Sequence, residues 1–432
     1  MSVLRSLQIG VSGLRANSDA LSVTGDNIAN VNTVGFKRSR GVFQDILGRA
    51  AGNSILGREA GAGVRLAGVE HMWSQGALVN TENATDLAIS GEGFFVVEGQ
   101  VQGTSGRSYT RAGQFHINES GELINPAGLR LQGHMAQPNG TMGSAVENIV
   151  VSTNAIPATP TSAVTMAANL DANAPIVAPN FDPLDPTGTS NFSTDVTTFD
   201  SLGNAHAVTV FFHKSASNAW DWHAMVDGGE LTGGTAGLPT ENASGTLTFT
   251  TDGELDTETP GASSWDFVNA TAAQAIAFDF GTSITTDLGS GLDGTTQFAA
   301  TSSTTGLTQD GFAAGSVDGI SIAQDGTVVG TFTNGQQRNL GQVVIATFAN
   351  INGLERGSAG LWTESRDSGA ALIGVAETGG RGSIVAGSLE QSNVDLGNEF
   401  VNLISYQRGF QANSRIITTA DEMYGELVNI KR

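Results

Sequence analysis

The sequence contains no cysteine, few aromatic residues and no long apolar run. Without cysteine, the chain has no disulfide, no thiolate metal ligand and no cysteine nucleophile. Its apolar stretches fall short of the ~18 residues that indicate a transmembrane helix, so we expect no membrane insertion. The first residues, "MSVLRSLQIGVSGLRANSDALS", hold neither the unbroken apolar segment nor the cleavage site of a Sec signal peptide. If the protein leaves the cytoplasm, we expect it to do so without a cleaved signal peptide.

Cations are also scarce, with 20 Lys and Arg against 42 Asp and Glu and a net charge of −22. The imbalance is concentrated in the middle of the chain, where residues 151–380 carry 24 acidic and 4 basic side chains. A surface of this sign repels nucleic acid and anionic membranes, so neither is an expected partner. Abundant glycine and polar turn residues instead favour solvated, turn-rich β-domains.

Both ends of the chain carry large apolar residues at a step of seven. A repeat of this kind indicates a helix that packs along another helix. The companion row at the C-terminus is half polar, with Asn393, Phe400, Gln407, Ser414, Asp421 and Val428. One partner helix leaves such a row uncovered, so we hypothesise that further copies of the chain complete it. The repeat consists of Leu7, Leu14, Leu21 and Ile28 at the N-terminus and Leu389, Leu396, Leu403, Phe410, Ile417 and Tyr424 at the C-terminus.

The segment between the predicted helices has the sequence pattern of β-structure. Asp-Gly and Asn-Gly pairs between β-branched runs, as in "GISIAQDGTVVGTFTNGQQ", are strong hairpin signals. We predict a mainly β, nested fold in which terminal helices pair and enclose a two-piece β-domain, which in turn encloses an outer β-domain. The expected parts are a terminal helical assembly domain (1–30 plus 388–432), a linker or hairpin region (31–70 plus 379–387), an inner β-domain (71–148 plus 311–378) and an outer inserted β-domain (149–310).

No constellation of residues indicates catalysis or a cofactor. "GEGFF" leads into a strand, whereas a dinucleotide-binding loop opens a helix. The acidic stretch "TDGELDTETPG" lacks the calcium-loop pattern and is better explained as an exposed loop, although whether it holds a divalent cation stays open. The six histidines are dispersed and form no metal motif. We therefore expect no enzyme, no cofactor and no metal site.

The two ends resemble bacterial flagellar axial proteins. "GDNIANVNTVGFKRSR" is similar to the rod and hook signature, and "SNVDLGNEFVNLISYQRGFQANSRIITTADE" is similar to the family tail. "TTFDSLGNAHAVTVFF" and the stretch around "SVDGISIAQDGTVVGTF" resemble hook proteins more than the shorter distal rod protein. The motif residues are Asn27, Asn30, Asn32, Gly35, Phe36 and Lys37 near the N-terminus and Asn393, Asp395, Gln407, Arg408, Gln411 and Asn413 near the C-terminus.

The resemblance implies a structural subunit that polymerises into a curved, hollow helical tube. Such a tube acts as a universal joint that passes motor torque from the rod to the filament. The implied partners are further copies of the chain, the distal rod protein, the hook cap protein, the hook–filament junction protein and the flagellar type III export apparatus. The implied location is the basal body and hook, outside the cell. The alternatives are a distal-rod-like axial protein and, in a different class, a secreted β-rich glycan-binding module, with an adhesin or surface-layer protein as a third.

Overall fold

The computed structural model describes residues 3–47, 61–101, 103–137, 140–151, 155–178, 180–260 and 263–430. The chain forms two compact units, each described here by itself. The first comprises Met1–Thr153, Asp318–Thr331 and Gln337–Arg432, and the second comprises Asn154–Val317 and Phe332–Gln336. The helices belong to the same unit as the inner β-domain. The finer four-part division stays a prediction, and residues 48–60 of the predicted linker lie outside the described residues.

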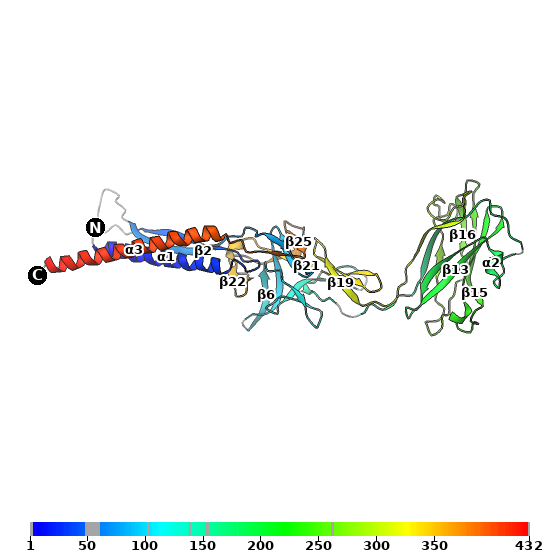
Figure 1. The fold of residues 1–432 in the computed structure, drawn as a ribbon, viewed down its shortest axis with the longest axis horizontal. Coiled ribbons are helices and arrows are strands. Elements are labelled where there is room, and N and C mark those ends of the chain that lie inside the picture. Colours follow the sequence, from blue (N-terminus) through cyan, green and yellow to red (C-terminus); the bar gives the residue numbers. More distant parts are fainter. Residues whose placement is uncertain are drawn as a thin grey trace. The chain divides into compact units, whose positions relative to one another are not determined.

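Two long helices, α1 (Val3–Ala29) and α3 (Leu396–Ile430), lie side by side in opposite directions (Figure 1). Each helix has a clear boundary signal. The Asn30 side chain donates to the Asp26 carbonyl at the end of α1, 2.8 Å away. The Asp395 carboxylate accepts the Asn398 N–H at the start of α3, 3.2 Å away, as an N-cap residue does. A hairpin of β1 (Ser39–Leu47) and β2 (Gly61–His71) packs against α1.

The predicted seven-residue helical repeat at the C-terminus is wrong at Leu389. This residue lies in the short strand β26 (Ser388–Glu390), where it pairs with Val79 of β3 (Leu78–Asn80). The helix begins at Leu396 because the preceding segment is extended and held by side-chain hydrogen bonds. The seven-residue spacing from Leu389 to Leu396 therefore does not continue the helical repeat.

A twelve-stranded sheet forms the β-part of the first unit, and it joins the two separated pieces of chain. Strand β21 from the second piece pairs with β9 and β5 from the first, with Gly341 opposite Met135 and Ile345 opposite Phe95. The mainly β fold with helical termini and a two-piece β-domain is thus confirmed. The strands of this sheet are β5 (Phe94–Val101), β6 (Thr104–Thr110), β7 (His116–Ile117), β8 (Leu123–Ile124), β9 (Arg130–Met135), β10 (Glu147–Asn148), β19 (Val317–Ile322), β20 (Thr327–Phe332), β21 (Gln337–Thr347), β22 (Glu355–Arg356), β23 (Leu361–Thr363) and β24 (Leu372–Val375).

A second short ladder lies beside β26. Strand β4 (Leu87–Ser90) pairs with β25 (Ser383–Ala386), and three of its four residues are buried. The 3-10 helix η2 (Ile351–Gly353) follows β21. Strands β25 and β26 precede α3 in the sequence, and they pair with β4 and β3, which follow the β1–β2 hairpin.

The second unit is built from a five-stranded and a three-stranded sheet. Trp220, Trp222 and Trp265 are each at most 2% exposed in its core. The antiparallel five-stranded sheet contains β12 (Phe192–Phe199), β13 (Ala205–Ala216), β14 (Ala219–Asp227), β15 (Pro239–Phe249) and β16 (Leu255–Pro260). The smaller sheet contains β11 (Ala163–Asn169), β17 (Ala277–Asp279) and β18 (Ser303–Gln309), and the short helices are α2 (Pro186–Thr189) and η1 (Gly228–Glu230).

Candidate functional site

Glycine and asparagine make close contacts between α1 and α3. A Cβ on Gly13 would lie 2.5 Å from the Asn413 Oδ1, and a Cβ on Gly409 would lie 2.7 Å from the Asn17 Oδ1. Each asparagine also donates its amide N–H to the backbone carbonyl four residues earlier, Asn17 to Gly13 and Asn413 to Gly409. The same four-residue arrangement therefore occurs once on each helix. It fixes the register of the antiparallel pair.

The apolar residues of the predicted seven-residue repeat lie beside this contact and are only partly buried. Leu7, Leu14, Leu21 and Ile28 are half-buried on α1, as are Leu403, Phe410 and Ile417 on α3. The fully buried positions of α1 are instead small or polar, with Ala16 and Ala20 at 1% and 2% exposure. Leu396 and Tyr424 are exposed, at 40% and 51%. Sequence reasoning missed the glycine–asparagine contact because small residues carry little apolar signal.

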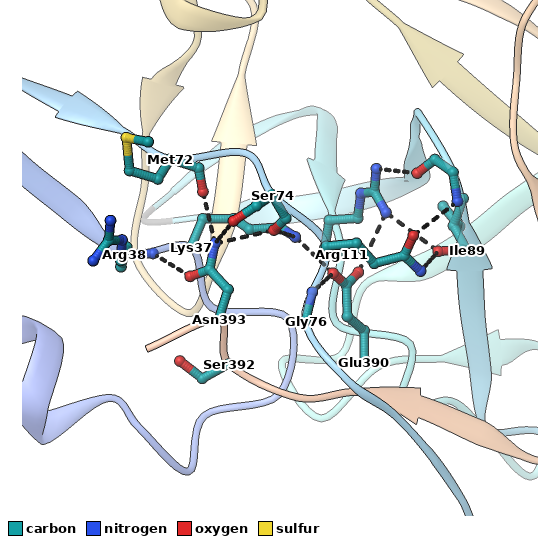
Figure 2. Close-up of polar contacts among 12 residues, drawn as sticks. Lys37, Arg38, Met72, Ser74, Gly76, Ile89, Arg111, Glu390, Ser392 and Asn393 are labelled. Carbon is teal, nitrogen blue, oxygen red and sulfur yellow. Dashed lines mark hydrogen bonds and ion pairs between the residues drawn. The ribbon is translucent and has the colours of Figure 1, made fainter. Parts of the chain in front are cut away.

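A buried cluster of charges, the charge hub, joins the start and the end of the chain to the sheet. It consists of Lys37, Arg111 and Glu390 (Figure 2). The Lys37 Nζ lies 2.6 Å from the Glu390 Oε1, and the Arg111 Nη1 lies 3.3 Å from the Glu390 Oε2. The Glu390 side chain is fully buried, and those of Lys37 and Arg111 are 1% and 6% exposed.

Backbone groups supply the remaining hydrogen bonds of the charge hub. Lys37 also donates to the Ser74 carbonyl, and Arg111 donates to the carbonyls of Ile89 and Gly91. The Gly76 N–H donates to Glu390. Burial lowers the pKa of the Lys37 ammonium, while the Glu390 carboxylate raises it and thereby opposes that shift. A buried ion pair is best tolerated when its remaining polar atoms are also hydrogen-bonded. This holds for the Lys37 ammonium and the Glu390 carboxylate, whereas the Arg111 Nε is buried without a hydrogen-bond partner in the described part of the chain.

Asn393 makes a second connection between the same segments (Figure 2). Its Oδ1 accepts the Arg38 N–H at 2.7 Å, and its Nδ2 donates to the Met72 and Ser74 carbonyls at 2.8 and 3.0 Å. The backbone adds two more bonds, from the Gly35 N–H to the Glu390 carbonyl and from the Asn393 N–H to the Phe36 carbonyl. The segments that enter and leave the helical pair are thus bonded to each other as well as to the sheet.

The other N-terminal motif residues build the turn after α1. Asn27 exchanges two hydrogen bonds of 2.8 Å with the backbone of Ser39. Gly35 has a φ of +69°, and a Cβ there would meet the backbone of Arg111 and Ala112 at 2.6 Å. Phe36 is buried under the Arg356 guanidinium, 5.0 Å from its ring centre. These residues let the chain approach the sheet closely.

Four motif residues lie on the surface of this unit. Asn32 is exposed in the turn after α1, and Gln407, Arg408 and Gln411 are exposed on α3. Their role is not explained by contacts within one chain. Across the described ranges, no group of three or more His, Asp or Glu is placed to hold a metal ion, and no helix is long and apolar enough to cross a membrane.

Comparison with known proteins gives matches along the whole chain. Four families match: "Flagella basal body rod protein" at residues 7–37, "Flagellar hook protein FlgE/F/G D1 domain" at 88–159, "Flagellar basal body protein FlaE D2 domain" at 169–312 and "Flagellar basal body rod FlgEFG protein C-terminal" at 385–430. The order of these matches follows the helices, the inner sheet and the second unit.

Full-length relatives are hook proteins. The flagellar hook protein FlgE of Treponema pallidum is 34% identical, with all of both chains covered. That of Escherichia coli K12 is also 34% identical, with 98% of each chain covered. The crystal structure of Helicobacter pylori flagellar hook protein FlgE2 shares the fold, with a TM-score of 0.50 and 14% identity, covering 72% of this chain and all of that one. Membership implies a homopolymeric flagellar assembly in the hook and basal body region. The chain therefore belongs to the flagellar hook protein FlgE family and is a structural subunit of the bacterial flagellar hook.

Proposed function

We propose that this subunit polymerises through its terminal helix pair into a curved, hollow tube that passes torque from the rod to the filament. The observation that carries the proposal is an uncovered apolar row on α3. Leu396, Phe400, Val401 and Ile404 are 40%, 50%, 67% and 49% exposed on the side of α3 that α1 leaves open. Contiguous apolar surface of this kind marks an interaction site, and a second copy is the partner that a homopolymer provides.

The apolar row on α3 faces no matching row in the described part of the same chain, so we propose that it packs into a different surface of a neighbouring copy. A groove of about 440 Å³ lies between α1 and the β1–β2 hairpin, lined by apolar side chains that include Leu7, Val11 and Leu66. When two different surfaces of identical subunits bind each other, each added subunit exposes a fresh binding surface. Such a contact builds an open polymer unless the rotation between subunits closes a ring. Stacked copies would then build a helical lattice of paired helices.

The charge hub gives the proposed joint a stiff connection between helices and sheet. A rotating joint must resist twisting while it bends. Force on the helical pair reaches the sheet through Glu390, which is bonded to cations from both sides of the connection. Because these groups are buried, their attraction is screened little by salt. We infer that torque passes through this rigid connection and that bending is taken up between copies.

The apolar row is tested by replacing Phe400 and Ile404 with aspartate. The double variant should stay monomeric while its circular dichroism spectrum matches the wild type, because about half of each residue is exposed in the single chain. A matched control is Ser405→Asp, which places a carboxylate at an exposed polar position of the same helix, about 100° around its axis from Ile404. Sedimentation and electron micrographs would report assembly. Tubes formed by the double variant would refute the proposal.

Family membership supports a further proposal about the specific partners and the export route. We propose that the subunit passes through the flagellar type III apparatus without cleavage and contacts the distal rod, hook cap and junction proteins at the ends of the tube. N-terminal sequencing of subunits from purified hooks tests the export route. Subunits that keep the residues following Met1 support it, and a shortened N-terminus contradicts it.

A further inference from the structure

His206 of β13 lies between two carboxylates of the second unit. Its Nδ1 is 2.6 Å from the Glu230 Oε2, and its Nε2 is 3.3 Å from the Asp200 Oδ2. A neutral imidazole carries a single N–H and can donate to only one of these oxygens, whereas the imidazolium ion carries an N–H on each nitrogen. Both contacts are therefore hydrogen bonds only when the ring is charged.

The ring of His206 is largely shielded from water. Phe267 stacks on it, with the ring centres 3.8 Å apart and the planes inclined by 14°. The Asp200 side chain is fully buried and that of His206 is 10% exposed, while that of Glu230 is 39% exposed. Because buried charges are screened little by salt, the attraction between the charged ring and Asp200 persists at high ionic strength.

No other charged side chain is bonded to this ring in the described part of the second unit. Asp266, which precedes the stacked phenylalanine, accepts a backbone N–H instead. The unit contains no arginine and a single lysine, Lys214, whose ammonium donates to the carbonyls of Ala172 and Ala174 at 2.6 and 3.1 Å. The charged ring of His206 is thus the cation that the two carboxylates share.

Asp200 also shapes the turn that joins β12 to β13. Its Oδ1 accepts the N–H groups of Leu202 and Asn204 at 2.8 and 2.9 Å, and its Oδ2 accepts the Asn204 side-chain amide at 2.9 Å. The carboxylate that His206 bonds is therefore the one that fixes the conformation of residues 200–204.

This turn packs against the two segments by which the chain enters and leaves the second unit. Those segments lie side by side, and Thr159 and Phe312 exchange backbone hydrogen bonds of 3.0 and 2.9 Å. A Cβ on Gly203 would lie 2.8 Å from the Ala158 Cβ and 3.2 Å from the Ala313 Cα. The turn thus contacts both segments closely, so a change in its order reaches both of them.

We propose that His206 is a proton-dependent clamp that holds this turn against the connecting segments. With the ring charged, His206 ties the turn through Asp200 to the 3-10 helix η1, which carries Glu230. When the ring loses a proton, one nitrogen presents a lone pair to a carboxylate oxygen, and one of the two attractions becomes a repulsion. The turn loosens locally as the pH rises, while the five-stranded sheet, which keeps its own ladders and core, stays folded. The inference concerns the single chain and is independent of polymerisation.

A nitroxide spin label on the turn of the full-length chain tests the clamp. Leu202→Cys gives one labelling site, because the chain has no cysteine of its own and Leu202 is 60% exposed. We expect the label to move more freely at alkaline than at mildly acidic pH. Adding His206→Gln should abolish this difference, and adding His116→Gln, at an exposed position of the first unit, should leave it intact. A label at Leu184→Cys, on another exposed loop, should show no such difference.

Nuclear magnetic resonance of nitrogen-labelled histidines gives a second readout in the unsubstituted chain. The His206 ring should carry a proton on both nitrogens at mildly acidic pH, and it should lose one over the same interval in which the label at residue 202 gains mobility. A ring with a bare nitrogen at mildly acidic pH, or a label whose mobility does not follow the loss of the ring proton, would overturn the inference. Neither result bears on the formation of tubes, so the proposed function would stand.

Discussion

Asn413 of α3 packs directly against Gly13 of α1, and its amide is held on the Gly409 carbonyl at 2.8 Å. Asn17 and Gly409 repeat the relationship in the opposite direction along the pair. The register of α1 and α3 is therefore set where the two backbones approach closely at glycine–asparagine contacts. The apolar heptad residues beside these contacts stay half-buried. This leaves large apolar groups available to other copies.

Overpacking this contact should separate the helices. Gly13→Val places carbon atoms where Asn413 lies, and we expect the helical pair to lose about 1–3 kcal/mol of unfolding free energy. Gly25→Val is the control, since no atom lies within 4 Å of a Cβ there. Urea unfolding followed by helical circular dichroism compares the two. Equal midpoints would show that the close approach at Gly13 is unimportant.

Removing the carboxylate of the charge hub should lower the free energy of unfolding. Glu390→Gln leaves two buried cations without their counterion, and loss of one buried partner typically costs about 3–5 kcal/mol. Glu70→Gln is the control, because Glu70 pairs with Arg40 on the surface, 2.6 Å away, with both side chains more than a third exposed. Exposed pairs contribute about 0–1 kcal/mol. Unfolding midpoints that are alike for the two variants would contradict a stabilising hub.

The contribution of the Asp200 carboxylate to the stability of the second unit should depend on pH. Burial favours the neutral acid of Asp200, but hydrogen bonds from Asn204, Leu202 and His206 outweigh it and hold the pKa below 3.8. The ionised group therefore stabilises the fold fully above pH 3.8, and this stabilisation is lost as the pH falls through the lower folded value.

Asp200→Asn should accordingly destabilise the second unit by about 1–3 kcal/mol at neutral pH. The difference from the wild type should shrink as the pH falls below 3.8. Thermal unfolding at several pH values measures it, with the exposed Asp252→Asn as control. A difference that stays constant down to the lowest pH would show that ionisation of Asp200 is not involved.

Deleting the second unit should leave a tube with altered mechanics. If residues 155–316 are replaced by a short Gly/Ser linker, the helices and the charge hub remain, so polymerisation should persist. Electron micrographs should show straighter tubes, since the outer contacts are gone, and swimming should be impaired. Normal curvature together with normal motility would count against a role of this unit in bending.

The sequence patterns predicted the elements better than the contacts between them. The helical termini, the hairpin signals and the insertion all follow from local periodicity and turn chemistry. Leu389 was misplaced because its spacing matched the heptad while Asp395 caps the helix six residues later. Glu390 and Lys37 are 353 positions apart, and no local pattern connects them. Gly13 and Gly409 were missed since their contribution is the absence of a side chain.

The central claim is that the paired terminal helices drive assembly, and it is tested by imaging a chain that ends at Asp395. This truncation keeps Glu390 and Asn393, so the β-sheets of both units should stay folded and give the β-sheet spectrum of the full chain. Electron micrographs of the purified full-length protein should show curved hollow tubes, and those of the truncated protein should show none. Tubes formed by the truncated protein would contradict the account.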